Sequence, residues 1–206
     1  MPKKNPNLVE TRREEIINSC EELYQKMNFK DITIMEIGKV TPFKRTTIYN
    51  YFNTKEEIFL ALLKREYDFW IEELENISAS HKTLSKKKLA DALAKSLENR
   101  SQLLKLMTMN HFDMEMNSSA ENLADFKRSY GKSLQAVKKC LDKFCPDFTE
   151  SDKENFLYAF FPFVYGIYPY AVVTEKQKSA MKAANVDYKF YSIHELAYNF
   201  LIKLLS

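Results

Sequence analysis

Glycine and proline are scarce in this chain, with 3 glycines and 6 prolines in 206 residues. Folds rich in sheets or loops use more of both, because their turns depend on these residues. Apolar residues instead recur at spacings of three and four along most of the sequence. The sequence therefore predicts an all-α protein.

Only three cysteines occur, Cys20, Cys140 and Cys145, and they form no CxxC motif. Their odd number and irregular spacing argue against a disulfide framework and against a zinc site. Cys20 falls on an apolar helical stripe, where a buried small side chain is expected. The N-terminal segment MPKKNPNLVETRREE lacks the apolar core of a signal peptide, so we expect a cytoplasmic protein.

Catalytic motifs are also absent, since the sequence has no GxSxG, P-loop, GxGxxG or HExxH pattern. His111, Asp113 and Glu115 alternate like metal ligands, but this spacing does not place all three on one helical face. We therefore expect no enzyme activity, no cofactor and no metal. The net charge of +3 at pH 7 indicates no particular partner, so a basic function would have to come from a local pattern.

The longest uncharged apolar segment covers residues 156–173, FLYAFFPFVYGIYPYAVV. Its length approaches the ~20 residues of a membrane-spanning helix. Tyrosines in the middle of a bilayer would each need a polar partner, however, and charged stretches follow on both sides. We therefore expect a buried helix in the body or at a dimer interface, and no membrane insertion.

The apolar spacing predicts about nine helices. A second helix opens at Thr33, a third covers residues 44–51, and a long fourth opens at Thr54. The apolar stripe of this fourth helix is Phe59, Leu62, Leu63, Tyr67, Trp70, Leu74 and Ile77. After a polar linker at 78–88, further helices are expected at about 84–97, 99–110, 119–144, 151–175 and 188–205. Capping-box patterns occur at Thr33, Thr54, Ser151 and Ser192.

Residues 41–55, TPFKRTTIYNYFNTK, contain no acidic side chain. Pro42 disfavours helix at Thr41, so a turn is expected between the second and third helices. Two short helices joined by a tight turn, with basic and hydroxyl residues on the second, are typical of a helix-turn-helix. The apolar residues expected to pack with the first helix are Ile37, Val40, Phe43, Ile48 and Phe52.

This packing leaves an outer surface without acids, which would otherwise repel DNA phosphates. Arginine and lysine reach guanine edges and phosphates, and Thr, Tyr and Asn bond phosphates or bases. Lys55 stands beside the free amides of a helix start, which favours a phosphate contact. The predicted DNA-binding residues are Thr33, Lys44, Arg45, Thr46, Thr47, Tyr49, Asn50, Tyr51 and Lys55.

The segment IGKVTPFKRTTIYNYFNTKEEIF, residues 37–59, resembles the N-terminal signature of TetR-family transcriptional regulators. That signature runs approximately I-A-x-x-A-G-V-S-x-x-T-[LI]-Y-x-[YH]-F-x-[ST]-K-E-x-[LI]. The matching positions are Ile37, Phe43, Thr47, Tyr49, Phe52 and Lys55. The resemblance covers about residues 10–60, whereas the rest of the chain is similar only in helical character and length.

The resemblance implies a homodimer that places each third helix in a major groove of an inverted-repeat operator. It implies that the body binds a small-molecule effector that releases the DNA. It also implies phosphate contacts for Thr47, Tyr49 and Lys55, and we assign Arg45 and Asn50 to base edges. The chain departs from the pattern at the turn, where Thr41-Pro42 replaces Ala-Gly, and at Lys44, which replaces a capping Ser. We therefore expect a weaker helix cap and an altered pose of the third helix.

Two segments of the body are candidates for the effector pocket. The first is methionine-rich and covers residues 103–119, where the alternative is core packing. The second is the aromatic segment 156–173, in which two prolines and a glycine are expected to kink the helix. The candidate effector residues are Met107, His111, Phe112, Met114, Phe160, Phe163, Tyr165 and Tyr168. In TetR-like regulators the last two long helices form a four-helix bundle across the dimer, so 151–175 and 188–205 are also the expected interface.

We therefore predict a helix-turn-helix DNA-binding domain at 1–56 and a larger helical effector-binding and dimerisation domain at 57–206. The expected function is that of a one-component repressor released by a small hydrophobic effector. The alternative is a helical DNA-binding or adaptor protein without an effector. Binding to an inverted repeat that a small hydrophobic ligand abolishes would separate the two.

Overall fold

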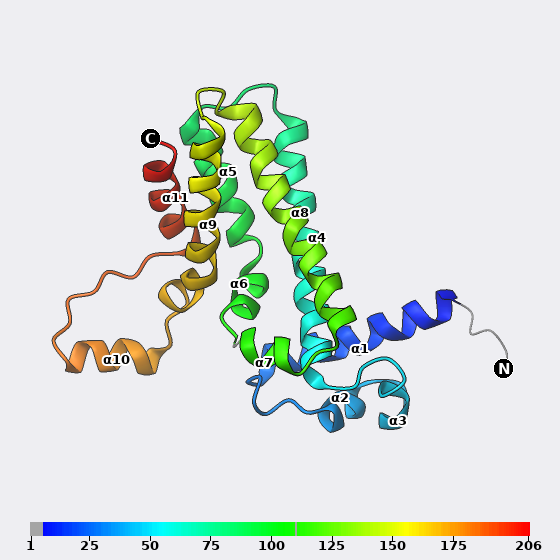
Figure 1. The fold of residues 1–206 in the computed structure, drawn as a ribbon. Helices are drawn as coiled ribbons and strands as arrows, with labels where there is room; N and C mark the ends of the chain where they lie inside the picture. The colour runs from blue at the N-terminus through cyan, green and yellow to red at the C-terminus, as the bar shows by residue number, and fades with distance from the viewer. Residues whose placement is uncertain (1–5, 110) are drawn as a thin grey trace. The chain divides into compact units, whose positions relative to one another are not determined.

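The computed structural model describes residues 6–109 and 111–206, and the side chains of Pro6, His111 and Phe112 lie outside this description. The described residues form eleven α-helices and no strand, which confirms the all-α prediction (Figure 1). The helices are α1 (Pro6–Lys26), α2 (Ile34–Val40), α3 (Arg45–Ile48), α4 (Lys55–Ser80), α5 (Lys86–Glu98), α6 (Ser101–Met107), α7 (His111–Met116), α8 (Ala120–Phe144), α9 (Glu150–Ala171), α10 (Glu175–Ala183) and α11 (Ile193–Leu204).

Two helices were not expected, α7 in the methionine-rich segment and α10 after the aromatic segment. The side chain of Thr174 caps α10 by accepting a hydrogen bond from the Gln177 amide. The last helix begins at Ile193 and not at 188, because Ser192 and Glu195 form the predicted capping box. The capping box predicted at Ser151 is wrong: α9 starts at Glu150, and the box joins Thr149 with Asp152.

The described chain divides into two compact units. The first extends to Arg65 and also takes in the segment that ends at Arg128, which holds α7 and the start of α8. The second comprises Glu66–Met109 and Ser129–Ser206. Residues well separated in the sequence therefore build the unit that contains the helix-turn-helix.

An apolar core joins α1, α2, α3 and α4 in the first unit. Ile37, Ile48 and Phe52 are buried there as predicted, and so is Cys20. Val40 is 42% exposed, so its predicted place in the core is wrong, and Phe43 is only half-buried. Because α2 ends at Val40, the neighbouring Thr41 takes the inward position.

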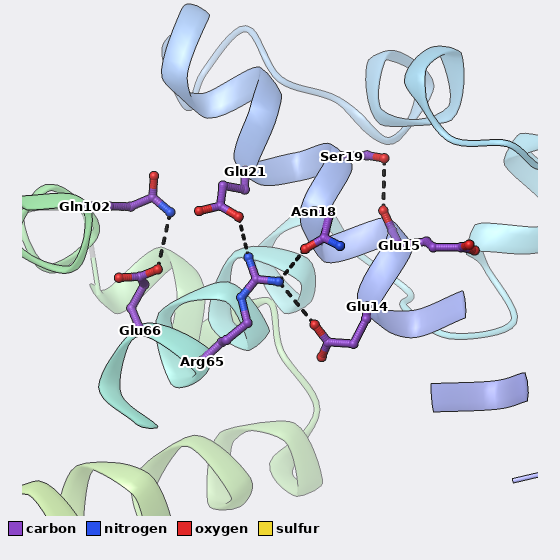
Figure 2. Close-up of polar contacts among 8 residues, drawn as sticks. All are labelled: Glu14, Glu15, Asn18, Ser19, Glu21, Arg65, Glu66 and Gln102. Atoms are coloured by element: carbon purple, nitrogen blue, oxygen red, sulfur yellow. Dashed lines mark hydrogen bonds and ion pairs between the residues drawn. The ribbon is translucent and has the colours of Figure 1, made fainter. Parts of the chain in front are cut away.

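Arg65 fastens α4 to α1 in this unit (Figure 2). Its Nη1 donates to Glu14 Oε2 at 3.1 Å and to Asn18 Oδ1 at 2.6 Å, and its Nη2 bonds the carboxylate of Glu21. The Arg65 side chain is only 16% exposed, so these bonds form in a poorly solvated place. Charge-assisted bonds of this kind are stronger than neutral ones and fix one packing of the two helices.

The second unit buries the central part of the α4 stripe, from Tyr67 to Leu74, together with α5, α6, α9 and α11. Trp70 lies at its centre, with its ring near Phe160 and Phe161 and its Nε1 donating to Ser96 Oγ at 3.0 Å. Helix α11 packs against α5 and α9, while α10 and residues 184–192 stand off from that layer (Figure 1). Ile77, the last residue of the predicted stripe, is half-buried.

All three cysteines are free and buried, and burial raises the pKa of the Cys20 thiol and, to about 11, that of Cys140. Across the described residues, no single helix is long and apolar enough to cross a membrane. Helices α9 and α10 meet the length and composition criteria only as a pair, and they are bent by 81° at the break between them.

Glu57 is the buried acid at the start of α4, with 2% of the residue exposed. One carboxylate oxygen accepts from the Asn53 amide at 2.7 Å and the other from the Ser119 amide at 3.0 Å. The Thr54 hydroxyl accepts from the Glu57 amide and donates to the Asn117 carbonyl. Thr54 therefore caps α4 as predicted. In addition, the Glu57 carboxylate connects α4 to the segment before α8.

Burial alone would raise the pKa of Glu57, but the hydrogen bonds from the Asn53 and Ser119 amides and from the Asn122 and Ser119 side chains together outweigh it and lower the pKa below its usual range. The ionised carboxylate therefore stabilises the folded chain fully at neutral pH, and this contribution is lost as the pH falls through the folded pKa. We expect Glu57→Gln to lower the free energy of unfolding at neutral pH by about 1–3 kcal/mol.

Urea denaturation at neutral and at acidic pH measures this effect, and Glu57→Gln should lose less stability on acidification than the wild-type chain. The matched control is Glu56→Gln, one residue earlier on the same helix and not fully buried. Equal effects of the two substitutions would contradict the assignment.

Candidate nucleic-acid interface

The turn between α2 and α3 is braced by Thr41. Its hydroxyl lies 3.2 Å from the Phe43 carbonyl oxygen and 3.4 Å from that of Gly38, so it donates within the turn. Thr41 itself is extended, with φ −82° and ψ 152°, which is the conformation that a following proline favours. Thr41-Pro42 therefore forms a turn that a threonine side chain stabilises without a glycine.

Helix α3 is short, because its regular part covers only Arg45–Ile48 and gives way to turns through Tyr51. The prediction of a helix to residue 51 is therefore too long. Lys44 occupies the N-cap position and makes no side-chain capping bond, as its replacement of a serine led us to expect. Ile48 and Phe52 anchor the segment in the core.

The burial of Ile48 and Phe52 turns the other side of this segment toward solvent. Most of the predicted DNA-binding residues lie on that side. Arg45 also lies close to α2, because a Cβ added to Gly38 would be 3.4 Å from the Cβ of Arg45. The exposed predicted residues are Thr33, Lys44, Arg45, Thr46, Tyr49 and Asn50. Thr47, Tyr51 and Lys55 are half-buried.

An open depression of about 450 Å³ lies between the starts of α2 and α4 and the outer side of α3. It brings together four of the predicted residues, Thr33, Arg45, Tyr49 and Lys55. The remaining lining residues, which the sequence reasoning missed, are Ile34, Met35, Thr54 and Glu56. The capping patterns at Thr33 and Thr54 were the available signal, because both helix starts open onto this surface.

Arg45 and Tyr49 form a pair one helical turn apart in this depression. Nη2 of Arg45 donates to the Tyr49 hydroxyl oxygen at 3.0 Å. The Arg45 Cζ atom also stands 5.6 Å from the centre of the Tyr49 ring. Both contacts leave the remaining guanidinium donors available to a ligand.

Lys55 has a different environment, although it lines the same depression. Its Nζ donates to the carbonyl oxygens of Phe29 at 2.8 Å and Ile32 at 3.0 Å, and it lies 4.2 Å from the centre of the Phe29 ring. Two of its three N–H donors therefore hold the loop before Thr33. This loop positions the start of α2.

The predicted effector residues lie in several places. Met107 and Phe160 are buried in the second unit and Met114 in the first, while the side chains of His111 and Phe112 lie outside the described part. Phe163 stacks on Phe200 of α11 with ring centres 4.0 Å apart. Tyr168 is half-buried, and its partial burial raises the pKa of its hydroxyl.

Tyr165, a half-buried candidate on α9, has a polar partner within its unit. Its hydroxyl lies 3.0 Å from that of Tyr67, on α4, and burial raises the pKa of the Tyr67 hydroxyl. Tyr130 meets Tyr67 and Phe161 edge-on and lines a cavity of about 380 Å³ between α8 and α9. Sequence reasoning placed Tyr67 in the core but could not pair it with a residue 98 positions away.

Titratable side chains gather elsewhere in ion pairs and not as a metal centre. Over the described ranges, no group of three or more His, Cys, Asp or Glu is arranged to hold a metal ion. Glu150, for example, bonds Lys138 and Lys153, and these lysines lower the pKa of its carboxyl to about 2.

Comparisons with known proteins agree on one family. A family model described as Tetracyclin repressor-like, C-terminal domain, matches residues 64–205. The HTH-type transcriptional regulator HbdR of Aromatoleum sp. (strain CIB) is 31% identical over 70 residues, which are 34% of this chain. The match spans only 31% of the length of HbdR.

Two solved structures share the fold over nearly their whole length. A TetR/AcrR-family regulator from Thermobifida fusca YX-ER1 has a TM-score of 0.65 and 17% identity, covering 95% of this chain and 96% of that one. The fatty acid degradation regulator FadR from Bacillus halodurans has a TM-score of 0.61 and 13% identity, covering 98% and 96%. At these identities the likeness establishes the fold.

The contacts of Lys55 predict a structural role in addition to any role in binding. We expect Lys55→Ala to lower the free energy of unfolding by about 1–3 kcal/mol, because two partly buried carbonyl groups lose a charged donor. Chemical denaturation measures the change, with Lys30→Ala as the control for removal of an exposed lysine from the same region. Equal stability of the two variants would show that the carbonyl contacts contribute nothing.

Proposed function

The chain belongs to the TetR family of transcriptional regulators, and we propose that it is a repressor that binds an inverted-repeat operator as a homodimer. In this proposal a small hydrophobic effector releases the DNA. The observation that carries the proposal is the exposed, acid-free outer side of α3 beside the starts of α2 and α4.

This surface has the chemistry of a DNA-reading helix although the whole chain has a net charge of only +3. Lys44 and Arg45 supply positive charge, and no acidic residue occurs from Thr41 to Lys55. Arginine bonds the O6 and N7 atoms of guanine with its planar fork, and asparagine bonds adenine in a similar way. We therefore assign Arg45 and Asn50 to base edges, and Thr33, Thr47 and Tyr49 to phosphates.

We propose residues 1–56 as the DNA-binding domain and 57–206 as the effector-binding and dimerisation domain. The first compact unit is larger than 1–56, because it includes α4 to Arg65 and the segment that ends at Arg128. That additional segment supplies the Asn117 and Ser119 backbone groups that hold the start of α4. The domain that reads DNA is therefore supported by residues from the middle of the chain.

We assign the dimer interface to α9 and α11. One side of α9 exposes an apolar surface in the single chain, where Tyr158 is 80% and Tyr170 is 60% exposed. Pro162, Gly166 and Pro169 are exposed on the same helix. Burial of this surface against a second copy would remove apolar area from water, which is the main driving force for association.

We assign the effector site to the second unit, at the cavity between α8 and α9 and the tyrosines behind it. Its apolar lining residues are Tyr130, Leu134, Leu157, Tyr158, Phe161 and Pro162. Aromatic walls with a few polar groups are typical of small-molecule sites. The Tyr67 ring meets that of Tyr130, and the hydrogen-bonded hydroxyls of Tyr67 and Tyr165 are the polar groups that we expect to orient a ligand.

The experiment that tests DNA recognition is a selection of bound sequences from a random duplex library. We expect the wild-type chain to enrich an inverted repeat, and Arg45→Ala to lose discrimination of about 1–3 kcal/mol at one base pair of each half-site. Lys44→Ala should instead weaken all sequences to a similar degree, since a lysine that contacts a phosphate carries no base information. Enrichment of no sequence over bulk DNA at physiological salt would reject the proposal.

A charged substitution on α9 tests the dimer. We expect Gly166→Glu to convert the homodimer to a monomer, because a carboxylate would be buried at the interface. A Cβ at Gly166 meets no atom within 4 Å, so the protomer has room for the new side chain. Light scattering after size-exclusion chromatography measures the mass. Gly131→Glu, on α8 and equally open, is the control and should remain dimeric.

A further inference from the structure

We propose that Tyr49 is a positioning residue for base recognition: its hydroxyl and ring hold the Arg45 guanidinium in the orientation that reads one base pair. This inference rests on the proposed function, and it changes the role of Tyr49 from phosphate contact to specificity. It follows from the geometry of the pair and from the different contacts of the other cations on this surface.

The two contacts to Tyr49 restrict the Arg45 side chain from two sides. The hydrogen bond of 3.0 Å between Nη2 and the hydroxyl oxygen sets the direction of the fork. The ring, 5.6 Å from Cζ, lies beside the same group. A free arginine samples many rotamers, and binding must then select one of them at an entropic cost.

The base of the Arg45 side chain is held as well. Ile48, which lies between the pair on α3, is fully buried and fixes the rotation of this segment about its axis. Gly38 lets α2 approach so closely that a Cβ there would be 3.4 Å from the Arg45 Cβ. The side chain therefore leaves the helix from a defined point and ends against a defined partner.

The other two cations of this surface lack such an arrangement. Lys55 directs its Nζ toward the carbonyl groups of Phe29 and Ile32. Lys44 is exposed and makes no capping bond. Arg45 is thus the cation that is both exposed and oriented, and its five N–H donors include enough for a bidentate base contact after one bonds Tyr49.

Tyr49→Phe removes the hydroxyl and keeps the ring, so it tests the hydrogen bond alone. We expect the preference at the base pair read by Arg45 to fall about three- to tenfold, which is the size expected for the loss of one such bond. For operators that are changed at that base pair, Tyr49→Phe and the wild-type chain should bind with nearly the same affinity, because Arg45 makes no productive base contact in either complex. A phosphate contact would give the opposite result, with all sequences weakened alike.

The experiment measures the affinity of the wild-type chain, Tyr49→Phe, Arg45→Ala and the double variant for the selected operator and for operators changed at each position. The inference requires that Tyr49→Phe has no further effect on base preference in the Arg45→Ala background. Tyr188→Phe removes a hydroxyl from a tyrosine outside the predicted DNA-binding residues, and it should not alter the preference at the Arg45 position. Thermal denaturation confirms that each variant is folded.

Uniform weakening of all operators by Tyr49→Phe, or the same effect with and without Arg45, would overturn the inference and leave DNA recognition itself intact. Arg45→Lys adds a second check, because lysine keeps the charge and lacks the fork. In that background Tyr49→Phe should again have no effect on base preference, and a full effect there would also overturn the role assigned to the pair. A wild-type chain without any base preference would reject the proposed function together with this inference.

Discussion

The start of α4 is the constraint on which the helix-turn-helix depends. Within four positions, Thr54, Lys55 and Glu57 bond backbone groups of three other segments: the turn before α4, the loop before α2 and the segment before α8. Backbone groups buried without partners are costly, so these bonds strongly favour a single arrangement. The N-terminal end of α4 therefore fixes both the position of α2 and the path of the chain after α3.

Three cations of the first unit illustrate how similar residues acquire different roles. Arg65 is held between α1 and α4 by Glu14, Asn18 and Glu21, so its charge is used inside the fold. Lys55 is held by backbone carbonyls at the edge of the outer depression. Arg45 is exposed and paired only with a neutral hydroxyl and ring, so its charge is available to a polyanion. Composition alone would have counted these three residues as equivalent.

Much of the fold and part of the site followed from the sequence because both depend on local rules. The spacing of Phe59 to Leu74 predicted the long buried stripe of α4, and the hydroxyl-to-acid spacing predicted the cap at Ser192. The exposure of Arg45 and Tyr49 followed from the burial of Ile48 and Phe52 between and beside them. The predictions were wrong where nearby residues were candidates for the same position. Thr41 is buried instead of Val40, and Thr149 caps α9 instead of Ser151. Neighbouring residues carry nearly the same local signal, so packing decides between them.

The sequence by itself determined the helical class, the family and the acid-free surface that faces outward, because periodicity, capping and charge are properties of short segments. Only the tertiary structure decided what each side chain contacts. It joined Tyr67 to Tyr165, Arg65 to α1, and Glu57 to Ser119, pairs that are separated by 40 or more positions in the chain. It also brought the carbonyl groups of Phe29 and Ile32 within hydrogen-bond distance of Lys55 Nζ, and this contact gives Lys55 a different role from that of Arg45. Such contacts arise only when a buried core brings distant segments together, and no local pattern records them.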